Sequence, residues 1–480
     1  MTLKKIFLVI AVLTTGLTPS WAGSPLTISI DAAHPEVAIS PDFSGLSFES
    51  SQMLSAKNGL RYFSPDNRPL IDLFQTLGIK SLRVGGNTAD RSAGQLPDKA
   101  DIDSLFTFAR IAGVKVIYCL RLHDGDPEQD AALAKYIMDN YAAQLDSFSI
   151  GQEPNVYPKV TNSMGVVSRP AYADYKKQWK QFENAIVAQA PEAKFCGPSV
   201  DNNPVWPQNF MADFGRGNHV VLITAHLYPG RSGDKVPTPE IGRDQMLEDG
   251  FIRTYQKLYV GFVPTAISNN LPYRLEEANN YFNGGAVDVS DTFASALWGL
   301  DFMYWWAAHG ADGVNFHTGD KVAAGNELRA SRYTAYFSVT NGFLVRPLGY
   351  GIKAFDVGRH GRIVPATISN PQNLNVSVYS VLGDDKYIYV TIINKEHGSA
   401  ARDADVSLDA GARFDHGQIM SLTVPGNDIA SKTGVTLGGA VIETNGSWNG
   451  KWTELTPAGT GSFTVKVPAA SASILRLVAD

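Results

Sequence analysis

The chain has 480 residues, of which 44% are hydrophobic and 18% are charged, and its formal net charge is −6. This composition excludes an intrinsically disordered chain and allows a large buried core. The net acidity, without a long basic run, argues against a nucleic-acid partner and leaves small molecules or sugars as ligands. The length suits two or three domains, or one barrel with a smaller unit.

Residues 1–22 have the pattern of a secretory signal peptide. Lysines near the start precede an apolar run at residues 6–13, which is shorter than the ~20 residues that cross a bilayer. A small-x-small triplet at residues 20–22 predicts cleavage, so the mature chain is expected to begin near Gly23. The alternative is a retained membrane anchor, but no stop-transfer pattern follows. We therefore expect a secreted or periplasmic protein without membrane contact after signal removal.

From residue 43 to about residue 360, apolar runs that end in polar residues alternate with helix-like segments. Eight strand ends follow this rule: Ser47-Phe48-Glu49, Arg83-Val84-Gly85-Gly86-Asn87, Leu120-Arg121-Leu122-His123, Gln152-Glu153, Pro198-Ser199-Val200-Asp201, Ala225-His226-Leu227-Tyr228, Leu275-Glu276-Glu277 and Asn315-Phe316-His317. Eight β–α units predict an α/β fold of the (β/α)8 TIM-barrel type. An open doubly wound sheet is the alternative, although residues 84–87 lack the G-x-G-x-x-G spacing of a nucleotide-binding loop.

The intervening helices are expected at residues 66–77, 127–144, 170–189 and 290–309. Proline near the start and a following glycine bound the first one. Asp126 is expected to cap the second helix, and Ser290 or Asp291 the last.

Two other parts of the chain alternate apolar and polar residues, as half-buried strands do. One is the segment at residues 26–30. The other is the region 361–480, where several short alternating runs are separated by Gly, Asn, Asp and Pro. Such a region is typical of an antiparallel β-sandwich domain.

The residues that could bind a metal are few and isolated. Cys119 and Cys196 make neither a zinc pattern nor a disulfide scaffold, so buried free thiols are expected, with one disulfide as the alternative. His123, His226 and His317 stand alone rather than in an H-x-H or H-E-x-x-H pattern, so each is expected to be a hydrogen-bonding pocket residue or a core residue rather than a ligand. We therefore expect no metal and no other cofactor.

Two strand ends carry carboxylates that could perform chemistry. Pro154 cannot donate to a strand ladder, so the strand before it must end and present Glu153 at its C-terminal edge. The alternative interpretation is that Glu153 is a solvated glutamate in a loop. Glu276 and Glu277 follow the seventh predicted strand. Glycosidic cleavage needs one carboxyl group that gives a proton to the leaving oxygen and one carboxylate that attacks the anomeric carbon.

These motifs also resemble a known family. Ile150-Gly151-Gln152-Glu153-Pro154-Asn155 resembles the acid/base strand of clan A glycoside hydrolases. Residues 275–285, followed by residues 290–294, resemble the nucleophile region of glycoside hydrolase family 79, which contains β-glucuronidases and heparanases. The strand ends at residues 47–49 and 83–87 resemble the first two of that family. The resemblance implies a catalytic barrel at residues 43–360, a β-sandwich at 361–480 and an N-terminal segment, 23–42, whose strand joins the sandwich.

By this resemblance Glu153 is the general acid/base. Glu277 is the nucleophile, because the following Asn279 and the double glycine align with the family pattern. Adjacent strand residues point to opposite faces, so Glu276 is expected to flank the site and to pair with Arg274. Glu276 stays the alternative nucleophile.

The resemblance further implies that tyrosine hydroxyls and backbone amides hold the sugar carboxylate, with four candidates: Tyr281, Gly284, Gly285 and Tyr333. Three cations offer charge instead: Lys321, Arg329 and Arg332. Tyr228 is expected to bind the nucleophile, while the sugar hydroxyls are assigned to the polar strand-end residues Glu49, Asn87, Asp90 and Gln152. Two positions depart from the family, which has asparagine in place of Gln152 and an aromatic hydroxyl in place of Phe282.

Three functions follow as hypotheses. The first is an exported retaining β-glucuronidase that needs no cofactor and whose two carboxyl groups lie ~5–5.5 Å apart. The second is an endo-acting, heparanase-like hydrolase of heparan sulfate, against which the net acidity weighs. The third is a non-catalytic carbohydrate-binding protein on a barrel scaffold.

Overall fold

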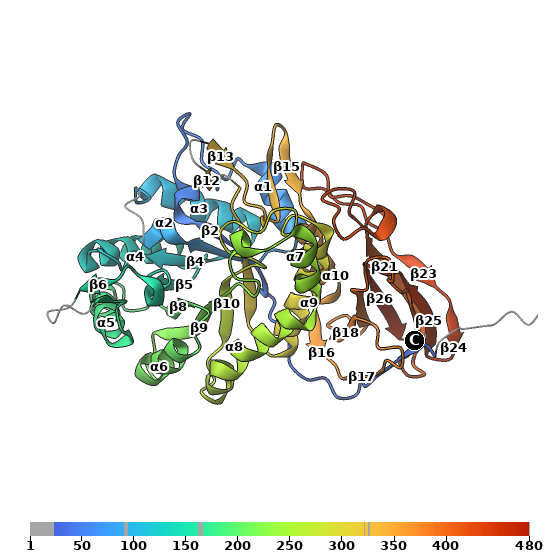
Figure 1. Cartoon of the computed structure of the whole chain (residues 1–480). Helices are drawn as coiled ribbons and strands as arrows, with labels where there is room; N and C mark the ends of the chain where they lie inside the picture. The colour runs from blue at the N-terminus through green and yellow to red at the C-terminus, as the bar shows by residue number, and fades with distance from the viewer. Residues whose placement is uncertain (1–23, 91–94, 162–166, 321, 325–326, 480) are drawn as a thin grey trace, which may run out of the picture.

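The structure is a computed structural model that describes residues 24–90, 95–161, 167–320, 322–324 and 327–479. The predicted signal peptide, Gly23 and Lys321 lie outside these residues. None of the described helices combines the length and the apolar character that a membrane span requires. The main body is a parallel β-barrel surrounded by helices, and the five-stranded and seven-stranded sheets lie to one side of it (Figure 1).

The barrel is closed by eight parallel strands, which confirms the predicted fold class and excludes the open sheet. In chain order the strands are β2 (Ser44–Glu49), β3 (Ser81–Gly85), β4 (Lys115–Leu120), β5 (Leu145–Ile150), β8 (Phe195–Asp201), β9 (Val220–Leu227), β10 (Tyr273–Ala278) and β11 (Gly313–His317). Strand β11 pairs with β2 and completes the ring. All eight predicted strand ends lie on these strands or within three residues of their ends.

The helices that cover the barrel are amphipathic or buried according to their position. They are α1 (Arg68–Thr76), α3 (Lys99–Ala112), α4 (Pro127–Tyr141), α5 (Tyr172–Gln189), α6 (Val205–Phe214), α7 (Pro239–Leu247), α8 (Asp249–Ser268), α9 (Phe293–Ala308) and α10 (Pro347–Gly358). The side chain of Asp126 caps α4 as predicted, by accepting a hydrogen bond from the Glu128 amide. The predicted cap of α9 is wrong, because Thr292 occupies the N-cap and the Ser290 hydroxyl donates to Asn280.

Helix α9 has almost no polar face, since fifteen of its residues are buried. A helix that is apolar all round must be covered on every side. Its partners are the barrel, α10 and the sandwich. Tyr379 of β18 (Val376–Gly383) stacks on Tyr304 at a centroid distance of 5.0 Å and donates a hydrogen bond to Asp301. Lys395 pairs with the other oxygen of Asp301 at 2.8 Å, so this buried ion pair helps to join α9 to the antiparallel sheets.

The sandwich contains one sheet of five strands and one larger sheet. The five-stranded sheet has the order β17 (Ala366–Ser369), β1 (Leu26–Ile30), β20 (Ala404–Asp409), β25 (Ser462–Val467) and β24 (Pro457–Gly459). The larger sheet is formed by β16 (Gly361–Ile363), β18, β19 (Ile388–Asn394), β26 (Ser471–Ala479), β21 (Phe414–Thr423) and β22 (Thr436–Leu437), and β23 (Thr453–Leu455) pairs with β21. Strand β1 thus inserts into the sandwich, and the alternating Leu26, Ile28 and Ile30 enter its core. Its pairing with β20 is parallel, an exception in the otherwise antiparallel unit.

Candidate active site

Glu153 lies just beyond the end of β5 in a backbone conformation that is rare for a residue with a side chain. Its φ of 48° and ψ of 55° are left-handed, and its amide donates to the Ser199 carbonyl at 2.9 Å. Pro154 then begins a short 3-10 helix. Left-handed conformations at non-glycine residues cost roughly 1–3 kcal/mol and cluster at functional sites. The turn places the carboxylate 3.0 Å from Nδ1 of His226, which stands on β9.

The other two carboxylates come from a β-bulge in β10. The register of β10 against β9 shifts between Leu275 and Glu277, and its register against β11 shifts between Leu275 and Ala278. A bulge breaks the alternation of side chains. As a result both glutamates reach His226: Oε1 of Glu276 lies 3.4 Å from Nε2, and Oε2 of Glu277 lies 3.9 Å from Nδ1.

Glu276 flanks the site, as expected, since it is fully buried and takes no part in lining the cavity described below. The two glutamates nevertheless do not point to opposite faces, because both reach His226. The predicted partner of Glu276 is wrong, because Arg274 pairs instead with Asp42 and Asp312, each at 3.2 Å.

Glu277 is surrounded by hydrogen-bond donors. Oε1 accepts from the Tyr228 hydroxyl at 2.9 Å, and Oε2 accepts from Arg83 Nη1 at 2.8 Å and from Gln152 Nε2 at 3.0 Å. Burial by itself would raise the pKa of this carboxyl group, but the charges of His317, His226 and Arg83 outweigh it and hold the pKa well below its usual range. Glu277 is therefore ionised at neutral pH.

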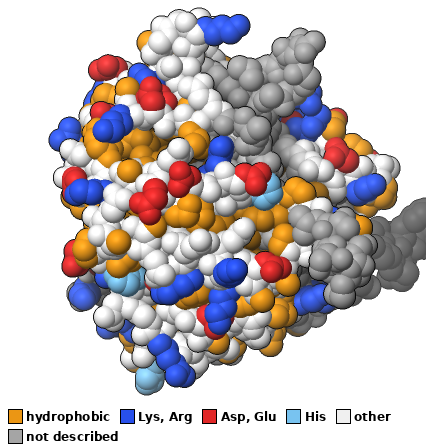
Figure 2. Space-filling view, turned by 90° about the vertical axis from the view of Figure 1, so that its left-hand side faces the viewer, with side chains coloured by type: hydrophobic (Ala, Val, Ile, Leu, Met, Phe, Trp, Pro, Cys, Tyr) orange, Lys and Arg blue, Asp and Glu red, His pale blue; other side chains and the backbone are white. Residues whose placement is uncertain are grey.

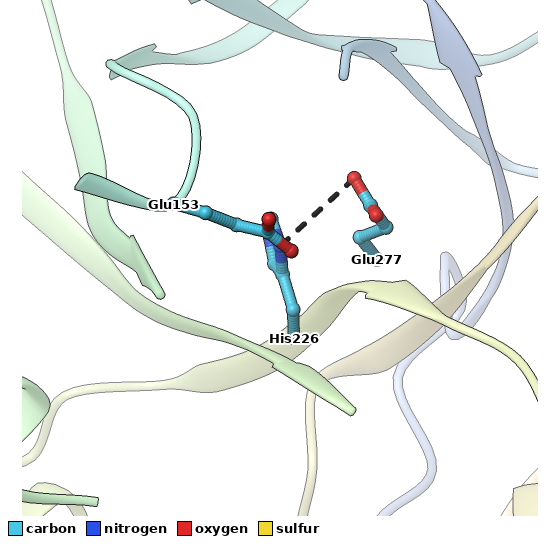
Figure 3. A group of neighbouring side chains, drawn as sticks. All are labelled: Glu153, His226 and Glu277. Atoms are coloured by element: carbon cyan, nitrogen blue, oxygen red, sulfur yellow. Dashed lines mark hydrogen bonds and ion pairs between the residues drawn. The ribbon is translucent and has the colours of Figure 1, made fainter. Parts of the chain in front are cut away.

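Glu153 and Glu277 face each other across a small space. Each places a carboxylate oxygen within 4.8 Å of the other and of a His226 ring nitrogen. Figure 3 shows the two side chains extending toward each other, Glu153 from the turn after β5 and Glu277 from β10, with the imidazole beside the Glu153 carboxylate. The space belongs to a cavity of about 330 Å³ lined by Glu49, Asn87, Glu153, Asp201, Tyr228, Glu277, Phe282, Asn283, Gly284, His317 and Tyr333. This volume is close to the lower end of small-molecule sites, ~300–1,000 Å³.

The side chains of Glu153, His226 and Glu277 are close enough to hold a metal ion, but their environment favours a protonated imidazole at His226 instead. Burial alone would lower the pKa of His226, yet Glu277, Glu153 and Glu276 together raise it to about 10. A protonated imidazole has no lone pair for a metal. In addition, the guanidinium of Arg83 contacts Glu277 directly and would repel a cation.

Comparison with known proteins agrees with this architecture. No protein-family model matches the chain. A β-glucuronidase of Aspergillus niger is 28% identical over 354 residues, which cover 62% of this chain and 61% of the relative. The chain thus aligns with less than two thirds of the length of that relative.

Solved structures share the fold over nearly the whole chain. A 4-O-α-L-rhamnosyl-β-D-glucuronidase of Fusarium oxysporum, in complex with Rha-GlcA, superimposes with a TM-score of 0.71 at 19% identity and covers 94% of this chain and 100% of its own. A GH51 arabinofuranosidase of Xanthomonas axonopodis superimposes with a TM-score of 0.66 at 14% identity and covers 95% of this chain and 100% of its own.

Most of the residues assigned to the site from the sequence line the cavity. Besides the two catalytic candidates they are Glu49, Asn87, Tyr228, Gly284 and Tyr333. Gly285 adjoins this wall, since a Cβ there would come within 2.9 Å of the Tyr333 amide nitrogen. Tyr228 donates to Glu277, as predicted.

Three assigned residues have other tasks. Asp90 is buried, and its two oxygens accept from the amides of Leu122, His123 and Gln152 and from the Tyr157 hydroxyl, so no lone pair is left for a sugar. The Gln152 amide bridges Arg83 and Glu277 instead of lining the cavity. Tyr281 points away from it: its hydroxyl donates to the Gly242 carbonyl at 2.9 Å and its ring packs on Phe251. The structure thus contradicts a sugar-binding role for Asp90 and Tyr281. For Gln152 that role stays a prediction, since its Nε2 carries a second hydrogen.

Arg83, Asp201 and Asn283 have no role in the site predicted from the sequence, yet Arg83 contacts Glu277 and the other two line the cavity. His226 and His317 are predicted as hydrogen-bonding or core residues; His226 contacts Glu153, and His317 lines the cavity. Four of these five residues lie in predicted strand ends, so position at the barrel face was the available signal. The sequence does not show in which direction these side chains point.

Proposed function

We propose that this protein is an exported retaining glycoside hydrolase that removes terminal β-linked glucuronic acid. The observation that carries the proposal is the convergence of Glu153 and Glu277, whose oxygens come within 4.8 Å across one sugar-sized cavity. Carboxyl groups of retaining enzymes lie ~5–5.5 Å apart and those of inverting enzymes ~6.5–9.5 Å, so the short distance favours retention. The resemblance to glycoside hydrolase family 79 and the name of the fungal relative support a glucuronide as substrate.

The two carboxyl groups differ in a way that assigns their roles. Glu277 is held ionised, against its burial, by the charges of His317, His226 and Arg83. The hydrogen bonds from Arg83 and Tyr228 also fix the direction of its oxygens. It attacks the anomeric carbon, the bond to the leaving oxygen breaks, and Glu153 gives that oxygen its proton. A water molecule then attacks the glycosyl-enzyme, Glu153 takes the proton from the water, and Glu277 leaves as a carboxylate.

The cavity offers uncharged donors to the carboxylate of the sugar. The described residues that line it include no lysine or arginine. Tyr333 is buried, and burial together with the charge of Glu277 raises the pKa of its hydroxyl well above its usual value, so the phenol stays a donor. Gly284 presents a backbone with a φ of 77° at the same wall. A phenol and backbone amides can recognise a carboxylate without a lysine or arginine.

The first test is the hydrolysis of an aryl β-glucuronide beside the matching aryl β-glucoside. We expect preference for the glucuronide and a first product that keeps the β configuration in a proton NMR time course. Glu277→Gln should lower kcat by roughly 10⁴-fold or more, as removal of a covalent nucleophile does. A mechanism-based 2-fluoro glucuronide should add its mass to the peptide that contains Glu277. Labelling of Glu276 alone, or a first product of inverted configuration, would refute the mechanism.

A second assay distinguishes this proposed glucuronidase from an endo-acting hydrolase of sulfated polymers. Lysine and arginine side chains are scattered among acidic and neutral ones on the face shown in Figure 2, which does not suit a long polyanion. We therefore expect no shortening of heparan sulfate chains under conditions in which the aryl glucuronide is fully hydrolysed.

Export rests on the signal-like pattern of residues 1–22. Expression of the full chain in a Gram-negative host should yield a periplasmic protein whose N-terminus lies near Gly23. Full-length protein confined to the cytoplasm would contradict export.

A further inference from the structure

A cavity that the catalytic chemistry does not use lies on the outer side of the barrel wall. It has a volume of about 360 Å³ and is bounded by β4, by the start of α3 and by α4. None of the described residues that line it also lines the catalytic cavity. Its volume lies within the range of small-molecule sites, ~300–1,000 Å³.

Most of the wall of this outer cavity is apolar. The apolar part is formed by Leu96, Pro97, Leu120, Leu133 and the rings of Tyr118 and Tyr136. Leu96 is a large apolar residue, yet it is 42% exposed, so the apolar wall reaches the surface of the molecule. A ligand with an apolar body would be stabilised here, because binding removes apolar surface from water on both sides.

One polar side chain in the wall lacks a partner. Asp130 belongs to the first turn of α4, lines the outer cavity and is only 7% exposed. Its Oδ2 is buried without a hydrogen-bond partner among the residues that the structure describes. A buried acceptor without a partner destabilises a folded chain. A molecule inside the cavity could supply the missing donor.

The place of Asp130 on its helix does not explain the unpaired oxygen. A carboxylate in the first turn of a helix normally stabilises the helix in its ionised form. Here burial and the charges of Asp90 and Asp126 raise the pKa of the Asp130 carboxyl group to about 8, although Arg121 lowers it. The group is therefore mostly uncharged at pH 7 and contributes little to the helix in this way.

The polar groups of the outer cavity suit a hydroxyl group. An uncharged carboxyl group donates through its proton and accepts through its other oxygen. Tyr118 lines the same cavity, and burial raises its pKa well above the usual value, so its hydroxyl keeps the proton and can donate. An alcohol or a phenol both donates and accepts, which lets it pair with Asp130 and with Tyr118.

The charges around the outer cavity disfavour an ionic ligand. The charged residues among the described ones that line it are two acids and two bases: Asp98, Asp130, Lys99 and Arg121. The ammonium group of Lys99 lies over the ring of Tyr136, 4.7 Å from its centroid. An ion would give up its hydration in a mostly apolar space that offers no net opposite charge.

We propose that the outer cavity is a binding site for an uncharged alcohol or phenol with an apolar body of one or two rings. The hydroxyl group pairs with Asp130, and the rings pack against the leucine and tyrosine side chains of the wall. Binding does not depend on the proposed hydrolysis, although the alcohol that such a reaction releases belongs to this class.

The first test measures the binding of 2-naphthol to the purified chain by calorimetry at pH 7. Two probes with the same rings carry opposite charges, namely 2-naphthylmethylammonium and 2-naphthoate. We expect one molecule of 2-naphthol per chain and an affinity at least about tenfold higher than that of either ion. Absence of 2-naphthol binding up to its solubility limit would refute the site, and an equal or higher affinity of an ion would refute the class of ligand.

A pair of tryptophan variants locates the bound molecule. Leu133→Trp fills the outer cavity from α4, and Lys135→Trp is the matched control, because Lys135 is exposed on the same helix and does not line the cavity. Leu133→Trp should weaken 2-naphthol binding by about tenfold or more, since a blocked pocket loses the buried contacts of the ligand. Lys135→Trp should bind as the wild type does. Equal affinities of the two variants would place the ligand elsewhere and refute the proposal.

Asp130→Leu tests the polar contact. It should weaken 2-naphthol roughly tenfold, as the loss of a hydrogen bond does, and leave the binding of 2-methoxynaphthalene, which has no proton to donate, unchanged. The melting temperature of the ligand-free variant should rise, because a buried acceptor without a partner is removed. A lower melting temperature together with equal weakening of both compounds would show that Asp130 supports the fold only, and would overturn its role in binding.

Discussion

The hydrogen bond from Tyr228 to Glu277 provides the sharpest test of the proposed nucleophile. Tyr228→Phe removes one hydroxyl, 2.9 Å from Oε1, and keeps the ring. Burial and the neighbouring Glu277 raise the pKa of Tyr228 well above its usual value, so this hydroxyl donates throughout the working pH range. A hydrogen bond to a charged group contributes about 1.5–3 kcal/mol, which corresponds to roughly 10- to 150-fold in rate if the bond serves the transition state.

The pH dependence gives the same variant a second readout. Burial favours the protonated form of Glu277, whereas His317, His226, Arg83 and the Tyr228 hydroxyl lower its pKa. Loss of the hydroxyl removes one of the groups that lower this pKa. The acid limb of the kcat/KM profile should therefore move to higher pH in Tyr228→Phe, because the nucleophile becomes protonated earlier as the pH falls.

Tyr281→Phe is the matched control. This tyrosine is also buried and its hydroxyl also donates at 2.9 Å, but to the Gly242 carbonyl outside the cavity. We expect it to lose about 1 kcal/mol of stability and to keep the wild-type pH profile. If both variants lowered kcat/KM alike, or if the acid limb of Tyr228→Phe stayed in place, Tyr228 would not support the nucleophile as argued.

Three further changes test the surrounding structure. Burial opposes the charge of His226, but its acidic neighbours raise its pKa from 6.5 to about 10. The charged imidazole therefore stabilises the fold fully below pH 6.5, and this stabilisation is lost as the pH rises toward 10. The difference in melting temperature between the wild type and His226→Gln should thus shrink from pH 6 to pH 9.5, and parallel curves would contradict the pKa assignment. Gly86→Ala places a Cβ 2.6 Å from both carboxylate oxygens of Glu49, at a residue whose φ is 73°. The KM should therefore rise, and the free energy of unfolding should fall by roughly 1–3 kcal/mol. A variant with the wild-type melting temperature would show that the loop adapts to the added methyl group. Lys395→Met leaves Asp301 buried without its cation. The melting temperature should drop by an amount equivalent to roughly 3–5 kcal/mol of unfolding free energy. The kcat/KM, measured well below the melting temperature of the variant, should equal that of the wild type.

The barrel could be predicted from the sequence because its signals are local. Each strand is a short buried run, and each ends at polar residues that a parallel sheet collects at one edge. Pro154 after Glu153 is a signal of this kind, since it ends the strand through its own covalent structure. The cap of α9 could not be read in the same way, because Ser290 has a stronger partner in Asn280, which belongs to the loop after β10.

The differences between the predicted and the observed site share another cause. The position of Asp90, Gln152 and Tyr281 near strand ends predicts contact with the substrate, yet each side chain is engaged by partners far away in the chain. Sequence distance hides these partners: Asp90 meets the amide of Gln152, 62 residues later. Whether a polar side chain at a strand end faces a ligand or supports its neighbours depends on such pairings.

The β-bulge in β10 shows why the electrostatics of the site do not follow from side-chain alternation. It brings Glu276 and Glu277 to the imidazole that Glu153 also contacts, so three carboxyl groups share His226, and Arg83 contacts Glu277 as a further cation. Burial opposes the ionisation of Glu276 and Glu277, but His226 and Arg83 lower the pKa values of both, and His317 lowers that of Glu277 further. In the proposed mechanism Glu153 must carry a proton when the leaving oxygen departs. Glu276 is fully buried and does not line the cavity, so it would act on the reaction through His226, which it shares with both catalytic candidates. Neutralising it in Glu276→Gln should therefore change the pH profile of kcat/KM and not KM alone.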